Sequence, residues 1–136
     1  MKKFVLPFII CTAIFSGYAS AADKQCPSNN AVYDAADNGE FIFAKDKGMY
    51  MIGTKEASLP SQDGKRYFKL VVAIPANDQV AKDPIQAAKS FIKDNAQSYV
   101  GSTSDFVNNT ICVYKGTMNT FFNPVSPMLY AVSNND

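Results

Sequence analysis

The chain has 136 residues, with 13 basic and 12 acidic side chains, no histidine and no tryptophan. This length suits one domain with one hydrophobic core, and a content of 47% hydrophobic and 12% aromatic residues excludes a disordered chain. Lysine and arginine are neither in excess nor clustered, so the composition predicts no nucleic-acid partner.

The first 21 residues have the three parts of a secretory signal peptide. Residues 1–3 are MKK, residues 4–15 are apolar, and residues 19–21, ASA, form a small-x-small cleavage pattern. A membrane-spanning helix needs about 20 apolar residues, and Pro7 interrupts this shorter run. We therefore expect cleavage after Ala21, no remaining membrane span, and export to the periplasm or the extracellular medium of a bacterium.

The expected cleavage site separates the three cysteines. Cys11 lies inside the signal peptide, among bulky residues unlike those of a lipid-attachment site, and is removed with it. The mature domain, residues 22–136, keeps 11 basic and 12 acidic side chains and two cysteines, Cys26 and Cys112. In an oxidising compartment an even pair predicts a disulfide. A reactive thiol would need a base or a lowered pKa, and the chain has no histidine and no CxxC motif.

Residues 28–38 have two interpretations. Ser28 can cap a helix with alanine and valine side chains along one face, and Gly39 would then take the left-handed conformation just past its end. Alternatively, Asn38-Gly39 is a typical two-residue hairpin turn, which would make this segment one arm of a hairpin. The alanine content and the helical spacing favour the helix.

Strand signals follow. Residues 40–44 (EFIFA) and 49–54 (MYMIGT) flank a turn and predict a hairpin. After a second turn at residues 62–64, residues 65–74 (KRYFKLVVAI) alternate as a strand. One face of this strand is wholly apolar and comprises Phe68, Leu70, Val72 and Ile74.

Tyr67 and Lys69 lie on the other, mixed face of the same strand. If exposed, they would form an aromatic and cationic patch suited to a protein or a glycan. Because soluble proteins rarely leave a large apolar face open, we expect a helix beginning at Pro84 to cover this face instead.

That helix has the clearest start signal in the chain. Asp83 is a cap, Pro84 occupies the first helical position, and Gln86 completes a capping box. Its apolar stripe predicts packing against the sheet and comprises Ile85, Ala88, Phe91, Ile92 and Tyr99.

The C-terminal part again predicts strands, at residues 110–114, around 120–122 and at 128–132, followed by a frayed tail at 133–136. The expected fold class is α+β. It is a single small domain with a mainly antiparallel sheet of about five to six strands, one or two helices on one face and one long-range disulfide.

Chemical motifs are weak. Ser90 and Lys93 form an S-x-x-K match in which the lysine would act as base, but its companion motifs are absent. Transition metals favour Cys and His, and four oxygen donors that remain for calcium fail the EF-hand spacing. These are Asp34, Asp37, Asn38 and Glu40. We therefore expect no metal and no cofactor.

These observations predict a small exported protein with a non-enzymatic binding or accessory role and a protein as its partner. Two alternatives stay open. One is a small hydrolase with an atypical Ser/Lys site at Ser90 and Lys93, or with paired carboxylates. The other is a subunit of a surface assembly, in which an edge strand such as residues 65–74 accepts a partner strand.

Overall fold

A computed structural model describes residues 21–104, 108–116 and 126–133. Residues 1–20 of the predicted signal peptide, with Cys11, lie outside this range. The strand predicted around residues 120–122 and the last three residues of the predicted tail lie outside it as well. No helix in the described part is both long and apolar enough to cross a membrane.

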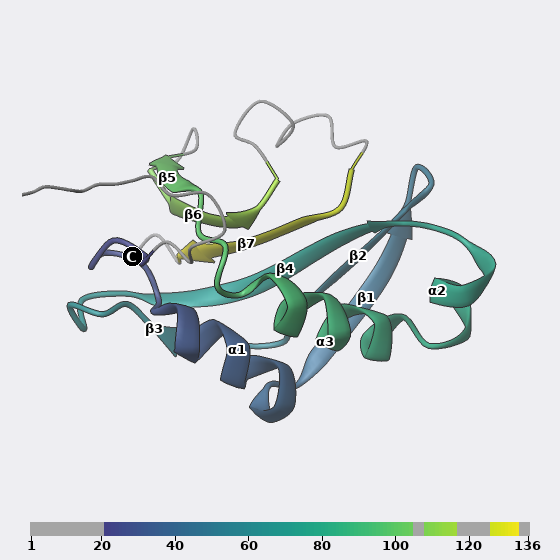
Figure 1. The fold of residues 1–136 in the computed structure, drawn as a ribbon, viewed down its shortest axis with the longest axis horizontal. Coiled ribbons are helices and arrows are strands. Elements are labelled where there is room, and N and C mark those ends of the chain that lie inside the picture. The colour runs from purple at the N-terminus through teal and green to yellow at the C-terminus, as the bar shows by residue number, and fades with distance from the viewer. Residues whose placement is uncertain (1–20, 105–107, 117–125, 134–136) are drawn as a thin grey trace, which may run out of the picture.

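The described residues form three helices and seven strands (Figure 1). In chain order these are α1 (Asn29–Asn38), β1 (Phe41–Asp46), β2 (Met49–Thr54), β3 (Leu59–Pro60), β4 (Tyr67–Pro75), α2 (Asp78–Lys82), α3 (Pro84–Asn95), β5 (Gly101–Ser104), β6 (Thr110–Lys115) and β7 (Met128–Ser133). The elements that sequence did not predict are the short β3, α2 and β5.

All the strands belong to one antiparallel sheet, with the order β1-β2-β4-β7-β6-β5 and β3 added beside β4. This confirms the predicted α+β class with a mainly antiparallel sheet. It also places β4 between β2 and β7, at the centre of the sheet. The prediction that residues 65–74 form an open edge is therefore wrong, since both sides of this strand are paired.

The main core lies between one face of the sheet and the helices α1 and α3, which pack together on that face (Figure 1). The apolar face of β4 supplies the centre of this core, as the alternation predicts, and α3 faces it with Ala88 and Ile92. Hydrophobic burial of this kind stabilises the domain by about 25 cal/mol for each Å² of apolar surface removed from water.

Residues 28–38 are helical, so the hairpin alternative is wrong. The Ser28 side chain accepts a hydrogen bond from the Ala31 N–H at 3.1 Å, as a helix cap does. The predicted left-handed Gly39 is also wrong, because its φ is −82° and its backbone is extended. Glycine is required here for another reason: a Cβ on Gly39 would lie 2.8 Å from the Ala35 carbonyl oxygen, closer than real contacts allow.

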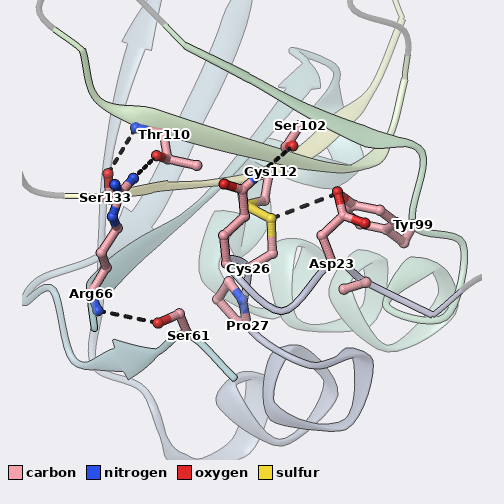
Figure 2. Close-up of a disulfide and its surroundings, with 12 residues drawn as sticks. Asp23, Cys26, Pro27, Ser61, Arg66, Tyr99, Ser102, Thr110, Cys112 and Ser133 are labelled. Atoms are coloured by element: carbon pink, nitrogen blue, oxygen red, sulfur yellow. Dashed lines mark hydrogen bonds between the residues drawn. A yellow bond between two sulfur atoms is a disulfide. The ribbon is translucent and has the colours of Figure 1, made fainter. Parts of the chain in front are cut away.

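The predicted disulfide joins Cys26 to Cys112 and ties the segment before α1 to β6 (Figure 2). Both cysteines are completely buried. The Tyr114 hydroxyl lies on the same side of β6 and donates a 2.5 Å hydrogen bond to the Pro27 carbonyl. These contacts hold the N-terminal segment to the sheet at two adjacent points.

The predicted frayed tail begins one residue too early. Ser133 belongs to β7 and is buried, and its hydroxyl accepts a 2.8 Å hydrogen bond from the Thr110 N–H of β6 (Figure 2). Ser133 is therefore part of the sheet.

The face opposite the helices is uneven. Over β6 and β7 it carries four buried apolar side chains that lie outside the main core: Ala73 of β4 with Ile111, Val113 and Met128. Over β1 and the start of β4 it is open, with Ile42 and Tyr67 both more than half exposed. The open part of the sheet therefore lies on the side of the hairpin β1–β2.

Candidate functional site

The hairpin β1–β2 is built around a two-residue turn. Lys47 and Gly48 have φ values of 51° and 80°, and Asp46 pairs directly with Met49 on either side of them. Two consecutive residues with positive φ match the right-handed twist of the flanking strands. The sequence signal for this hairpin is thus confirmed, and the turn fixes its register from Phe41 opposite Thr54 to Asp46 opposite Met49.

β1 is one of the two edge strands of the sheet, with β5 at the opposite edge, and among the described residues no strand pairs with the outer side of β1. In an antiparallel ladder the N–H and C=O groups of alternate residues point to opposite sides. Lys55 N–H donates to the Glu40 carbonyl at 2.7 Å, which directs the even-numbered residues of this strand toward β2. The backbone groups of Phe41, Phe43 and Lys45 therefore point outward along the edge.

Two large apolar side chains accompany these outward groups. Ile42 is 57% exposed on the open face, and Phe43 is 50% exposed on the helix face. The Phe43 ring leans against Tyr50 of β2, with 6.0 Å between ring centroids. Phe41 lies on the same face of the sheet as Phe43 and packs against the main core. The strand is therefore anchored at Phe41 and open from Ile42 onward.

A hollow of about 200 Å³ adjoins the same hairpin. Lys45 and Tyr50 line it from β1 and β2, and Asn77 and Asp78 line it from the start of α2. The Asn77 side chain is engaged in capping α2, since it accepts hydrogen bonds from two backbone N–H groups at 2.9 and 3.0 Å. The hollow is shallow, and its residues add polar contacts beside the edge.

The exposed β1 strand, its outward backbone groups and the side chains of Ile42 and Phe43 together are called the β1 edge below. An unpaired edge with exposed apolar residues is a surface that can accept another strand. An edge of this kind is chemically suited to an extended polypeptide, because its backbone groups can supply hydrogen bonds and its alternate side chains can supply apolar contacts.

The residues that sequence singled out on β4 are not covered. The helix from Pro84 packs on the face of Phe68 and Leu70, and Tyr67 is 56% exposed with Lys69 beside it on the open face. The expectation that α3 covers Tyr67 and Lys69 is therefore wrong. These two residues lie on β4, which is flanked by β2 and β3 on one side and by β7 on the other, so they do not lie on an open edge of the sheet.

The S-x-x-K match does not form a reactive pair. Lys93 bonds to Asp37 of α1, with 2.8 Å between Nζ and Oδ1, and lies 5.8 Å from the centre of the Tyr33 ring. The hydrogen bond to Asp37 raises the pKa of Lys93 above its ordinary value of 10.5. A lysine that stays protonated is a poor general base for Ser90, and this pair instead links α1 to α3.

The oxygen donors considered and rejected as calcium ligands do not converge either. Asp37 is engaged by Lys93, whereas Asp34 and Asn38 line a different hollow of about 230 Å³ between α1 and β2. Within the described ranges, no three His, Cys, Asp or Glu side chains gather closely enough to hold a metal ion.

Polar side chains around the disulfide serve the fold (Figure 2). The Tyr99 hydroxyl donates to Asp23 at 3.1 Å and lies 3.7 Å from the Cys26 sulfur. Burial raises the pKa of Tyr99 above 10.0, so this phenol stays protonated at neutral pH. Arg66, the single arginine, donates to the Thr110 hydroxyl. None of these groups lines the hollow beside the hairpin or the hollow beside α1.

No known family model, curated protein or solved structure significantly matches this chain. The sequence showed the apolar run Phe41-Ile42-Phe43 but gave no sign that it lies at an edge, because the order of strands depends on long-range pairing.

Proposed function

We propose that this is a small exported bacterial protein with a non-enzymatic binding role, and that it binds an extended protein segment by strand addition at the β1 edge. The observation that carries the proposal is the combination of outward backbone groups on Phe41, Phe43 and Lys45 with the half-exposed side chains of Ile42 and Phe43. Main-chain hydrogen bonds would supply affinity, and the alternate side chains would supply selectivity.

Charged residues lie on both sides of the exposed apolar residues of the β1 edge and would make binding there selective. Glu40 precedes the exposed apolar residues, and Lys45 and Asp46 follow them, all three exposed. Charged residues on an edge strand limit nonspecific aggregation. A partner strand must then match the short apolar stretch at Ile42 and Phe43, which restricts the sequences that fit.

Export is the second part of the proposal and rests on the sequence of residues 1–21. The buried disulfide is compatible with it, because disulfides persist in oxidising compartments. Protein recovered from the producing organism should begin at Ala22, as measured by intact mass.

Site-specific photo-cross-linking tests the binding role. A photoreactive phenylalanine analogue at position 43 should capture a protein in the producing organism, because it replaces a half-exposed aromatic ring on the binding surface. The same analogue at position 67 is the matched control, since Tyr67 is similarly exposed, 56% against 50% for Phe43, but lies on a central strand of the sheet. Equal capture at both positions, or none at position 43, would contradict strand addition at this edge.

A further inference from the structure

We infer that the strand added at the β1 edge is β1 of a second copy of this chain, paired antiparallel across a twofold axis. This inference rests on the proposed function and names its partner. Closed twofold dimers are the commonest oligomers. A twofold axis perpendicular to the sheet places both sets of helices on the same face and continues the sheet through the two copies.

Symmetry and hydrogen bonding restrict how the two strands can align. In such a pairing one residue lies opposite its own copy, and paired residues share a face of the sheet. Since Phe41, Phe43 and Lys45 carry the outward backbone groups, the ladder can be centred on Ile42, Phe43 or Ala44.

Two of these alignments are unfavourable. A centre at Phe43 sets Glu40 opposite Asp46 of the partner strand at both ends, and like charges directly opposite are destabilising. A centre at Ala44 sets Ile42 opposite Asp46 of the partner strand. It also sets Phe43 opposite Lys45, so the exposed apolar side chains would face charged ones.

The alignment centred on Ile42 avoids both faults. Ile42 meets its own copy on the open face, and Phe41 meets Phe43 on the helix face. Apolar and aromatic cross-strand pairs of this kind are stabilising. Glu40 then lies opposite Ala44, so no like charges stand directly opposite each other. The most exposed apolar residues of the edge are thus the ones that become covered.

The area buried between the two copies determines how stable the dimer is expected to be. Stable interfaces bury roughly 1,200–2,000 Å² in total. With Ile42 at the centre, only residues 41–43 of β1 lie opposite β1 of the second copy, which is a small contact. We therefore expect a dimer that forms and dissociates with concentration. In sedimentation velocity, the unmodified mature protein should pass from monomer toward twice that mass as its concentration rises, whereas Ile42→Lys should stay monomeric.

Variants with one added cysteine identify which residue lies opposite its own copy. Ile42→Cys, Phe43→Cys and Ala44→Cys each report one of the three centres, and Tyr67→Cys is a control of matched exposure. The native disulfide is fully buried and remains intact. Under oxidised glutathione, Ile42→Cys should form covalent dimers at least about tenfold faster than Tyr67→Cys, because pairing raises the effective thiol concentration. The opposed Cα atoms of such a pair lie about 4.5 Å apart, within reach of a disulfide.

The outcomes separate this inference from the proposal it rests on. Fastest cross-linking at Phe43→Cys or Ala44→Cys would overturn the Ile42-centred alignment. If no variant exceeds Tyr67→Cys and the mass of the unmodified protein stays monomeric at all concentrations, the second copy is excluded. If the photoreactive residue at position 43 nevertheless captures a different protein, strand addition stands with another partner. Far-UV circular dichroism checks that each variant is folded.

Discussion

At the scale of single residues, several side-chain hydrogen bonds stabilise the turn before β4. The Ser61 hydroxyl donates to Asp63 at 2.6 Å and accepts from the Arg66 N–H at 3.1 Å. Asp63 also accepts from the Lys65 N–H at 3.0 Å, and Gly64 takes a φ of 73°. The sequence predicted the turn from its aspartate and glycine. The contribution of Ser61 was not predicted, because it depends on the side chain folding back across the turn.

This network predicts a measurable titration. The hydrogen bond from Ser61 and then that from Lys65 N–H hold the pKa of Asp63 below its ordinary value of 3.8. Because the folded pKa is lowered, the stabilisation is present above pH 3.8 and is lost as the pH falls through the lower folded value. Ser61→Ala should raise the pKa of Asp63 toward 3.8, as followed by NMR of its carboxyl carbon.

Lys65→Met is the control for this titration. It removes a charge whose effect on Asp63 is smaller than that of either hydrogen bond, and it keeps the backbone N–H in place. An equal change in both variants would show that charge, rather than the Ser61 hydroxyl, sets the pKa.

At the scale of elements, sequence predicted what is local and missed what depends on distant pairing. Alternation in residues 65–74 identified the buried face of β4, and Asp83-Pro84 marked the start of α3. β5 was missed because its sequence, GSTS, has no apolar alternation, although it pairs with β6 along its whole length. The site was missed for a related reason: a pattern of side chains does not show which strand lies at the edge.

The packing of α3 gives a prediction at this scale. Ile92 is completely buried between the helix and the sheet, whereas Ser90 on the same helix is exposed. Ile92→Ala should lower the free energy of unfolding by about 2–5 kcal/mol, because it removes buried methyl groups and leaves a cavity. Ser90→Ala should change it by less than about 0.5 kcal/mol. Urea denaturation measures both, and similar losses in the two variants would contradict the assignment of the buried face.

At the scale of the whole molecule, the disulfide joins two segments that are 86 positions apart. It closes residues 26–112, which include all three helices and β1 to β5, into a loop and fixes the segment before α1 against β6. A covalent link over such a distance restricts the unfolded chain far more than a link within one hairpin does. The small domain is therefore stabilised by one covalent closure in addition to its core.

Removing that closure should have a large effect. The double variant Cys26→Ala/Cys112→Ala should lose about 4–5 kcal/mol of unfolding free energy in the chain-entropy description. Thermal and urea unfolding of the oxidised protein, of the reduced protein and of the variant provide the measurement. A reduced protein as stable as the oxidised one would show that the loop closure contributes little.

The same cysteine pair has a consequence for the order of events during biosynthesis. If residues 1–21 are removed as we propose, Cys26 and Cys112 are the only thiols in the chain, and a single intramolecular pairing exists. Cys26 is synthesised early, and its partner Cys112 becomes available only when β6 is synthesised. Oxidative folding of this protein then requires an oxidant but no isomerase, and the bond can close only after β1 to β5 have been synthesised.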